Sequence, residues 1–132
     1  MFSIDKGYYK YIYYLSFCHP IHIIFTYIHE RYLCCFLNIL LMMSSINYWK
    51  YPILKSINQY IDFFVVFLNI IHYLYIYYLS QNILLTFILQ LIAIINLIEE
   101  YYLTYKDYTK ITILHSLIHI FTSITSCIIC YI

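Results

Sequence analysis

Two histidines and an aspartate are the residues whose types and spacing could support chemistry. His115 and His119 form an HxxxH pair, and residues four apart share a helix face, which lets two imidazoles bind one metal ion. Asp62 could be a third ligand, orient a ligand imidazole, or act as a base toward a metal-bound water, with Ser45 at the rim. These three residues are therefore candidate ligands of a zinc ion. The interpretation that we favour is that the histidines hydrogen-bond Asp62 or Glu100 and only hold helices together.

The composition places these residues in a membrane. Of 132 residues, 64% are hydrophobic and 10% are charged, and the mean hydropathy is +0.78. An ordinary soluble domain has about 45–50% apolar and about 25% charged residues, and a small domain leaves much of its chain exposed. A soluble enzyme, a disordered tail and a secreted disulfide scaffold are therefore disfavoured. The net charge of +1 provides no basic surface for nucleic acid.

Four stretches are long and apolar enough to cross a bilayer, which takes roughly 20 such residues. They are approximately residues 20–46, 56–79, 82–101 and 111–131. Residues 1–19 are rich in tyrosine and are predicted to lie at the interface as an N-terminal segment. The predicted fold class is all-α, a transmembrane bundle of about four helices within residues 20–132. The sequence leaves open whether the first stretch is one span or is broken near Glu30 and Arg31.

Four antiparallel spans place both termini on one side of the membrane and loops 47–55 and 102–110 on the other. These two loops carry Lys50, Lys55, Lys106 and Lys110. Lysines and arginines near span ends favour the cytoplasmic side. We therefore expect both loops to be cytoplasmic.

Each predicted span carries a polar face when its residues are projected at 100° per residue. The faces hold Arg31, Cys35, Asn38 and Ser45; Asn58, Asp62, Asn69 and His72; Thr86, Gln90, Ala93, Asn96 and Glu100; and Thr112, His115, His119, Thr122, Ser126 and Cys130. Polar groups facing lipid are costly, so we expect all four faces to meet inside the bundle. At about 1.5 Å per residue, Asp62 and the two histidines lie at similar depth and should be neighbours.

Short motifs around these residues resemble those of the alkaline ceramidase and progestin/adipoQ-receptor superfamily of membrane proteins. The motifs lie in residues 44–49, 61–64 and 114–121. The resemblance implies a zinc-dependent lipid amidase or a related receptor. Ser45 and Asp62 would match the family's Ser and Asp, and His115 and His119 its final His pair. This sequence departs from the family in two ways. Trp49 stands where the family has its first zinc-ligand His, and the sequence has about four predicted spans where the family has seven.

Two functions of different classes remain. We favour a small multi-pass membrane protein without enzymatic activity, with a scaffold, assembly or interaction role. Its partners would be the lipid bilayer and copies of itself or other membrane proteins. The alternative is a metal-dependent, ceramidase-like lipid hydrolase or a degenerate relative that uses Asp62, His115 and His119. The abundance of isoleucine and tyrosine, which have AT-rich codons, indicates an AT-rich genome such as that of a large DNA virus or a protist.

Overall fold

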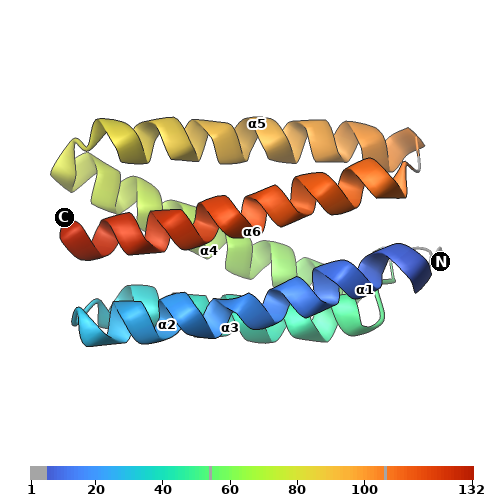
Figure 1. The fold of residues 1–132 in the computed structure, drawn as a ribbon, viewed down its shortest axis with the longest axis horizontal. Helices are drawn as coiled ribbons and strands as arrows, with labels where there is room; N and C mark the ends of the chain where they lie inside the picture. The colour runs from blue at the N-terminus through green and yellow to red at the C-terminus, as the bar shows by residue number, and fades with distance from the viewer. Residues whose placement is uncertain (1–5, 54, 106) are drawn as a thin grey trace.

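The computed structural model describes residues 6–53, 55–105 and 107–132, which form a bundle of helices (Figure 1). Its helical elements are α1 (Lys6–Leu15), a 3-10 turn (Ser16–Cys18), α2 (His19–Ile28), α3 (Tyr32–Lys50), α4 (Ile57–Ser80), α5 (Ile83–Tyr105) and α6 (Tyr108–Tyr131). Helices α3 to α6 are each long and apolar enough to cross a membrane. The all-α fold with four candidate spans is therefore confirmed.

The connections on either side of α5 fall where the sequence predicts them. Gln81 has a left-handed φ of 52° and ends α4. The Asn82 side chain then accepts a hydrogen bond from the Leu85 N–H (3.0 Å) at the start of α5. Asp107 caps α6 in the same way by accepting from the Lys110 N–H (3.3 Å). The hydrogen bond from the Lys110 side chain holds the pKa of Asp107 below its usual value.

The prediction of one span over residues 20–46 is wrong, because the chain reverses direction within it. Glu30 has a left-handed φ of 59°, and the Arg31 N–H closes the turn by donating to the Thr26 carbonyl (2.9 Å). A straight helix would carry Glu30 and Arg31 into the bilayer, where charges are expensive. The turn keeps both at the end of the bundle, and α2 packs back against α3.

Residues 6–28 form one helical rod instead of an interfacial segment followed by a span. The backbone stays helical through the 3-10 turn, and Pro20 lies in the first turn of α2, where its missing N–H costs nothing. Figure 1 shows α1 and α2 in line. The buried residues of the rod recur at helical spacing: Ile12, Ser16, His19, His22 and Thr26. The rod thus packs one face against the rest of the bundle. Residues 1–5 of the predicted segment lie outside the described residues.

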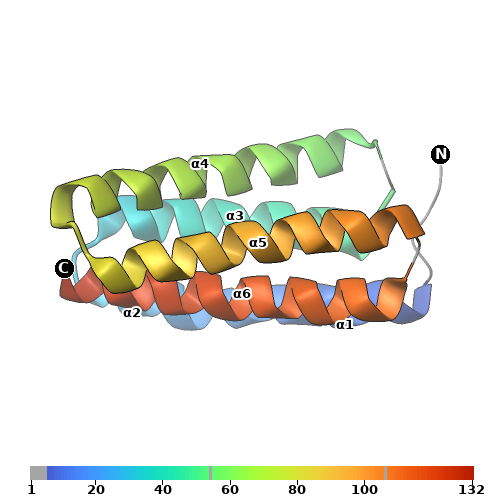
Figure 2. The same cartoon turned by 90° about the horizontal axis from the view of Figure 1, so that it is seen from above.

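The added rod also changes the topology. The described chain begins and ends at opposite ends of the bundle, not on one side as predicted (Figure 1). The described residues of loops 47–55 and 102–110 do lie at the same end of the bundle, where α1 begins (Figure 2). Leu54 and Lys106 lie outside the described residues. The two loops share one end as predicted, because both connections depend only on the four later helices.

The rod of α1 and α2 packs against both α3 and α6, while α4 packs on α3 and α5 packs on α6. Three of the four predicted polar faces turn inward, with Asn38 of α3, Asp62 and Asn69 of α4, and His119 and Ser126 of α6 all buried.

The polar face of α5 is the exception. This helix buries Leu85, Ile88, Ile92 and Ile95. Gln90, Ala93, Asn96 and Glu100 are exposed. The prediction that this face meets the others is wrong, because the opposite and mainly apolar face of the same helix packs on α6, with Glu99 as its polar member.

Candidate functional site

Asp62 lies in the second turn of α4, whose start is capped by the Ser56 hydroxyl accepting from the Gln59 N–H (3.3 Å). Its side chain is 4% exposed. The hydroxyls of Ser44 and Ser45, adjacent on α3, both donate to Asp62 Oδ1 at 2.8 Å. Ser45, which the sequence places at the rim of the candidate site, thus bonds Asp62 directly, and the two bonds tie α3 to α4.

His115 lies where α6 faces both α5 and α3. A hydrogen bond of 2.9 Å joins its Nδ1 to Oε1 of Glu99 on α5. The Trp49 ring of α3 packs edge-on against the imidazole, with 4.8 Å between centroids. The partner of His115 is thus Glu99, not the Glu100 or Asp62 considered from the sequence.

His119 lies one turn further along α6 and meets the N-terminal rod. Its ring centroid is 5.0 Å from that of His115 and 5.0 Å from that of His19. His19 in turn has its Nδ1 2.9 Å from Nε2 of His22. Four imidazoles from two helices therefore form a continuous row inside the bundle.

The predicted zinc site is not assembled by this arrangement. Among residues 6–53, 55–105 and 107–132, no three His, Cys, Asp or Glu side chains are grouped as metal ligands would be. The Asp62 oxygen is occupied by two serine hydroxyls, and His115 is held by Glu99 and Trp49. The structure brings Ser45 to Asp62 and His115 to His119, and each of these two pairs has its own further partners.

The participation of the N-terminal rod was not predicted, because residues 1–19 were expected to lie at the interface. In the structure His19 and His22 are each 2% exposed, and His19 contacts His119, whereas Cys18 is exposed. The signal was available, because the buried residues of the rod are spaced four, three, three and four apart, as on one helix face.

A second polar cluster lies nearer the other end of the bundle, where α3, α4 and α6 meet. Asn38 Nδ2 donates to Ser126 Oγ (3.2 Å). The Tyr73 hydroxyl lies 3.2 Å from the same oxygen and 3.5 Å from Asn38 Oδ1. Asn38 and Ser126 are each 0% exposed. Counting residues from the helix ends would place Asn38 at the same depth in the membrane as Asp62 and His119. The structure instead places it in this second cluster.

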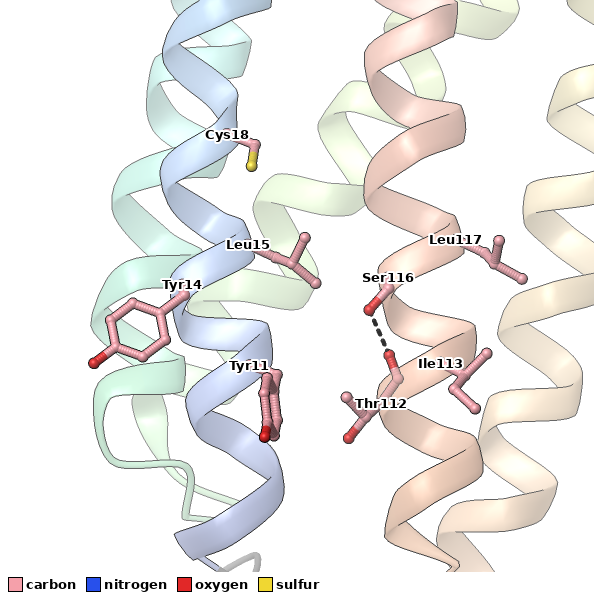
Figure 3. A pocket seen from close by; sticks show the side chains of 8 residues that line it. All are labelled: Tyr11, Tyr14, Leu15, Cys18, Thr112, Ile113, Ser116 and Leu117. Carbon is pink, nitrogen blue, oxygen red and sulfur yellow. Dashed lines mark hydrogen bonds between the residues drawn. The ribbon is translucent and has the colours of Figure 1, made fainter.

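A groove on the outside of the bundle runs between α1 and α6 and has a volume of about 640 Å³. Figure 3 shows Leu15 and Cys18 projecting from the rod toward α6, and the Ser116 hydroxyl bonded to the Thr112 carbonyl of its own helix. The lining is mostly apolar and includes Tyr11 and Tyr14, but none of the four histidines. The groove therefore gives no access to the imidazole row.

The sequence was also compared with known proteins. No family model matches the chain, and no curated protein or solved structure is similar to it.

Proposed function

We propose that this chain is a non-enzymatic integral membrane protein that acts by assembling with copies of itself through α5. The observation that carries the proposal is the exposed polar face of this helix, formed by Gln90, Ala93 and Asn96. The face lies in the most hydropathic of the four candidate spans. Amides facing acyl chains leave their hydrogen-bonding groups without water, which is costly. A second protein surface over α5 removes that cost.

A second copy of the chain fits this face by its chemistry. Each primary amide has both donors and an acceptor, so Gln90 and Asn96 can pair with the same residues of a copy. A two-fold interface places one surface patch against itself. Ala93, the single alanine of the sequence, lies between the amides and allows two helix backbones to approach closely. The face is therefore self-complementary.

The test is the oligomeric state of the Gln90→Leu/Asn96→Leu variant in lipid bilayers. Interhelical hydrogen bonds in membranes contribute about 0.6 kcal/mol each and up to roughly 1.7. We expect the double variant to raise the dissociation constant at least about tenfold, which is roughly 1.4 kcal/mol. Energy transfer between labelled copies, followed as lipid dilutes the protein, measures this constant.

The matched control is Phe63→Leu/Phe67→Leu, which changes two exposed residues of α4 and should leave association unchanged. A monomeric wild-type protein would contradict the proposal. So would an α5 variant that associates as strongly as the wild type.

We further propose that the end of the bundle where α1 begins faces the cytoplasm. Lys10 lies near that end with Lys50, Lys55 and Lys110, whereas Arg31 lies in the turn at the other end. Gathering the lysines at one end strengthens the positive-inside argument beyond the two loops considered from the sequence.

Glycosylation mapping in microsomes tests this orientation. An acceptor site inserted in the turn at residues 29–31 should be modified, because that turn would face the lumen. An acceptor inserted at residues 51–56 should stay unmodified. The reverse pattern on gel-shift analysis would show that the orientation is inverted.

A metal-dependent lipid hydrolase is the second candidate function. The hydrogen bond from Ser45 to Asp62 favours it, because these residues match the Ser and Asp of the ceramidase-like motifs. We place it second because Asp62 bonds Ser44 as well, and Glu99 and Trp49 hold His115. Stoichiometric zinc in the purified protein, lost in His115→Ala/His119→Ala, would reverse this order.

A further inference from the structure

We propose that the buried imidazoles form a proton relay through the interior of the bundle. In order, the relay consists of Glu99, His115, His119, His19 and His22. This inference is independent of self-assembly through α5, because every member lies within one chain.

The contacts along the row are continuous. Glu99 Oε1 and His115 Nδ1 are 2.9 Å apart. Adjacent ring centroids from His115 to His119 and from His119 to His19 are each 5.0 Å apart. His19 Nδ1 then lies 2.9 Å from His22 Nε2. The two outer links are thus hydrogen-bond contacts. The two middle links are ring-to-ring contacts that rotation of the rings must convert into hydrogen bonds, because Nε2 of His19 and Nε2 of His119 have no partner.

The imidazoles also keep nitrogen atoms that packing alone does not use. Within the described part of the chain, Nε2 of His19 and Nε2 of His119 are buried and have no hydrogen-bond partner. Buried polar atoms are normally paired, so two such nitrogens on contacting rings indicate a role other than holding helices together. Protons passing along the row would use both.

Each transfer moves one proton and no electrons. The Glu99 carboxyl group passes its proton to Nδ1 of His115, which then releases the proton on Nε2 toward His119. His119 passes one proton to Nε2 of His19, and His19 releases the proton on Nδ1 to Nε2 of His22. His22 releases the proton on Nδ1 to water at its end of the row, and the Glu99 carboxylate takes up a proton from water at the other end. Every ring thus gains one N–H bond and loses another, and every group regains its starting charge. Rotation of the rings then restores the starting arrangement.

The row covers the central part of the bundle. Glu99 lies six residues before the end of α5 at Tyr105, and His22 lies six residues before the end of α2 at Ile28. These helix ends are at opposite ends of the bundle (Figure 1). At 1.5 Å per residue, each end of the relay is about 9 Å from the nearer helix end. Thr26, fully buried one turn beyond His22, continues the polar path.

The surroundings of His115 differ from those of the other three rings. Trp49 covers one side of the His115 ring, with 4.8 Å between centroids. His115 and Glu99 have side chains 18% and 15% exposed. That end of the row is therefore its more open entrance.

The test is proton flux into liposomes that contain the purified full-length protein and a trapped pH-sensitive dye. A potassium gradient with valinomycin supplies the driving potential. We expect wild-type flux well above that of protein-free liposomes and at least about tenfold lower flux in His119→Gln. Glu99→Gln should lower the flux similarly while keeping a hydrogen-bonding group beside His115, so its result counts even where His119→Gln fails to fold.

His72→Gln is the matched control, because His72 is buried on α4 with an unpartnered Nε2 but lies outside the row. Its flux should equal that of the wild type. The proposal is overturned by wild-type flux no greater than that of empty liposomes, or by unchanged flux in Glu99→Gln. Equal loss of flux in His72→Gln, or release of trapped potassium without valinomycin, would also overturn it.

Discussion

The double variant Ser44→Ala/Ser45→Ala should lose about 3 kcal/mol of unfolding free energy, because it leaves a buried acidic group without donors. Both serine hydroxyls donate to the same Asp62 oxygen at 2.8 Å, and the Asp62 side chain is 4% exposed. No water in the bilayer core can replace the lost bonds. Reversible unfolding in bicelles, measured by steric trapping, gives the free energy directly.

Adding Asp62→Leu to the same variant should restore most of the lost stability. Removing both partners of a buried polar interaction is far less costly than removing one. The control is Ser116→Ala/Ser123→Ala, whose hydroxyls donate only to carbonyls of their own helix, at 2.7 and 2.9 Å. This control should change stability by less than about 1 kcal/mol. If the triple variant is less stable than Ser44→Ala/Ser45→Ala, the carboxyl group is not what the serines stabilise.

The inward faces of α3, α4 and α6 could be predicted because each carries its polar residues on the side that packs. The same rule failed for α5. This helix has an apolar face and a polar face of similar extent, and Leu85, Ile88, Ile92 and Ile95 pack on α6. One-chain periodicity cannot say whether a polar face meets its own bundle or another copy. The failure is therefore itself the observation that points to self-assembly.

The N-terminal rod was not predicted because its hydropathy is too low for a membrane span, although one of its faces packs inside the bundle. Residues 6–18 are polar and tyrosine-rich, so their composition does not predict a membrane span. They nevertheless place Ile12 and Ser16 on one face with His19 and His22. Once the chain reverses at Glu30, that face covers α3 and α6. The turn depends on a single left-handed residue, which no periodic pattern signals.

The sequence identified residues of the candidate site, Asp62, His115 and His119, but not the partners that they bond. Depth along the helices predicted Asp62 and His115 as neighbours, but in the structure each bonds another partner. Depth could not show that Ser44 and Ser45 would occupy the carboxyl group, or that Glu99 would be nearer than Glu100 to His115. Such choices depend on helix rotation, and neighbouring positions on a helix differ by about 100°.

Asn38→Leu should produce the second large loss of stability, about 2–4 kcal/mol. The Asn38 amide donates to Ser126 Oγ at 3.2 Å and to Cys34 Sγ at 3.5 Å. Its carbonyl oxygen lies 3.5 Å from the Tyr73 hydroxyl. Each interhelical bond contributes about 0.6–1.7 kcal/mol in a membrane. Leucine has the same number of side-chain heavy atoms as asparagine, so the rest of the loss comes from the buried Ser126 and Tyr73 hydroxyls, which are left with one partner fewer.

Asn96→Leu provides the matched comparison, because Asn96 is exposed and donates only to the Ile92 carbonyl of its own helix (2.7 Å). Measured at a lipid dilution where the protein is monomeric, this change should alter the unfolding free energy by less than about 1 kcal/mol. Equal losses in the two variants would mean that the cluster of Asn38, Tyr73 and Ser126 adds nothing beyond an ordinary polar side chain. A much larger loss in Asn38→Leu shows instead that this cluster fixes α3, α4 and α6 together, at the far end of the bundle from Asp62.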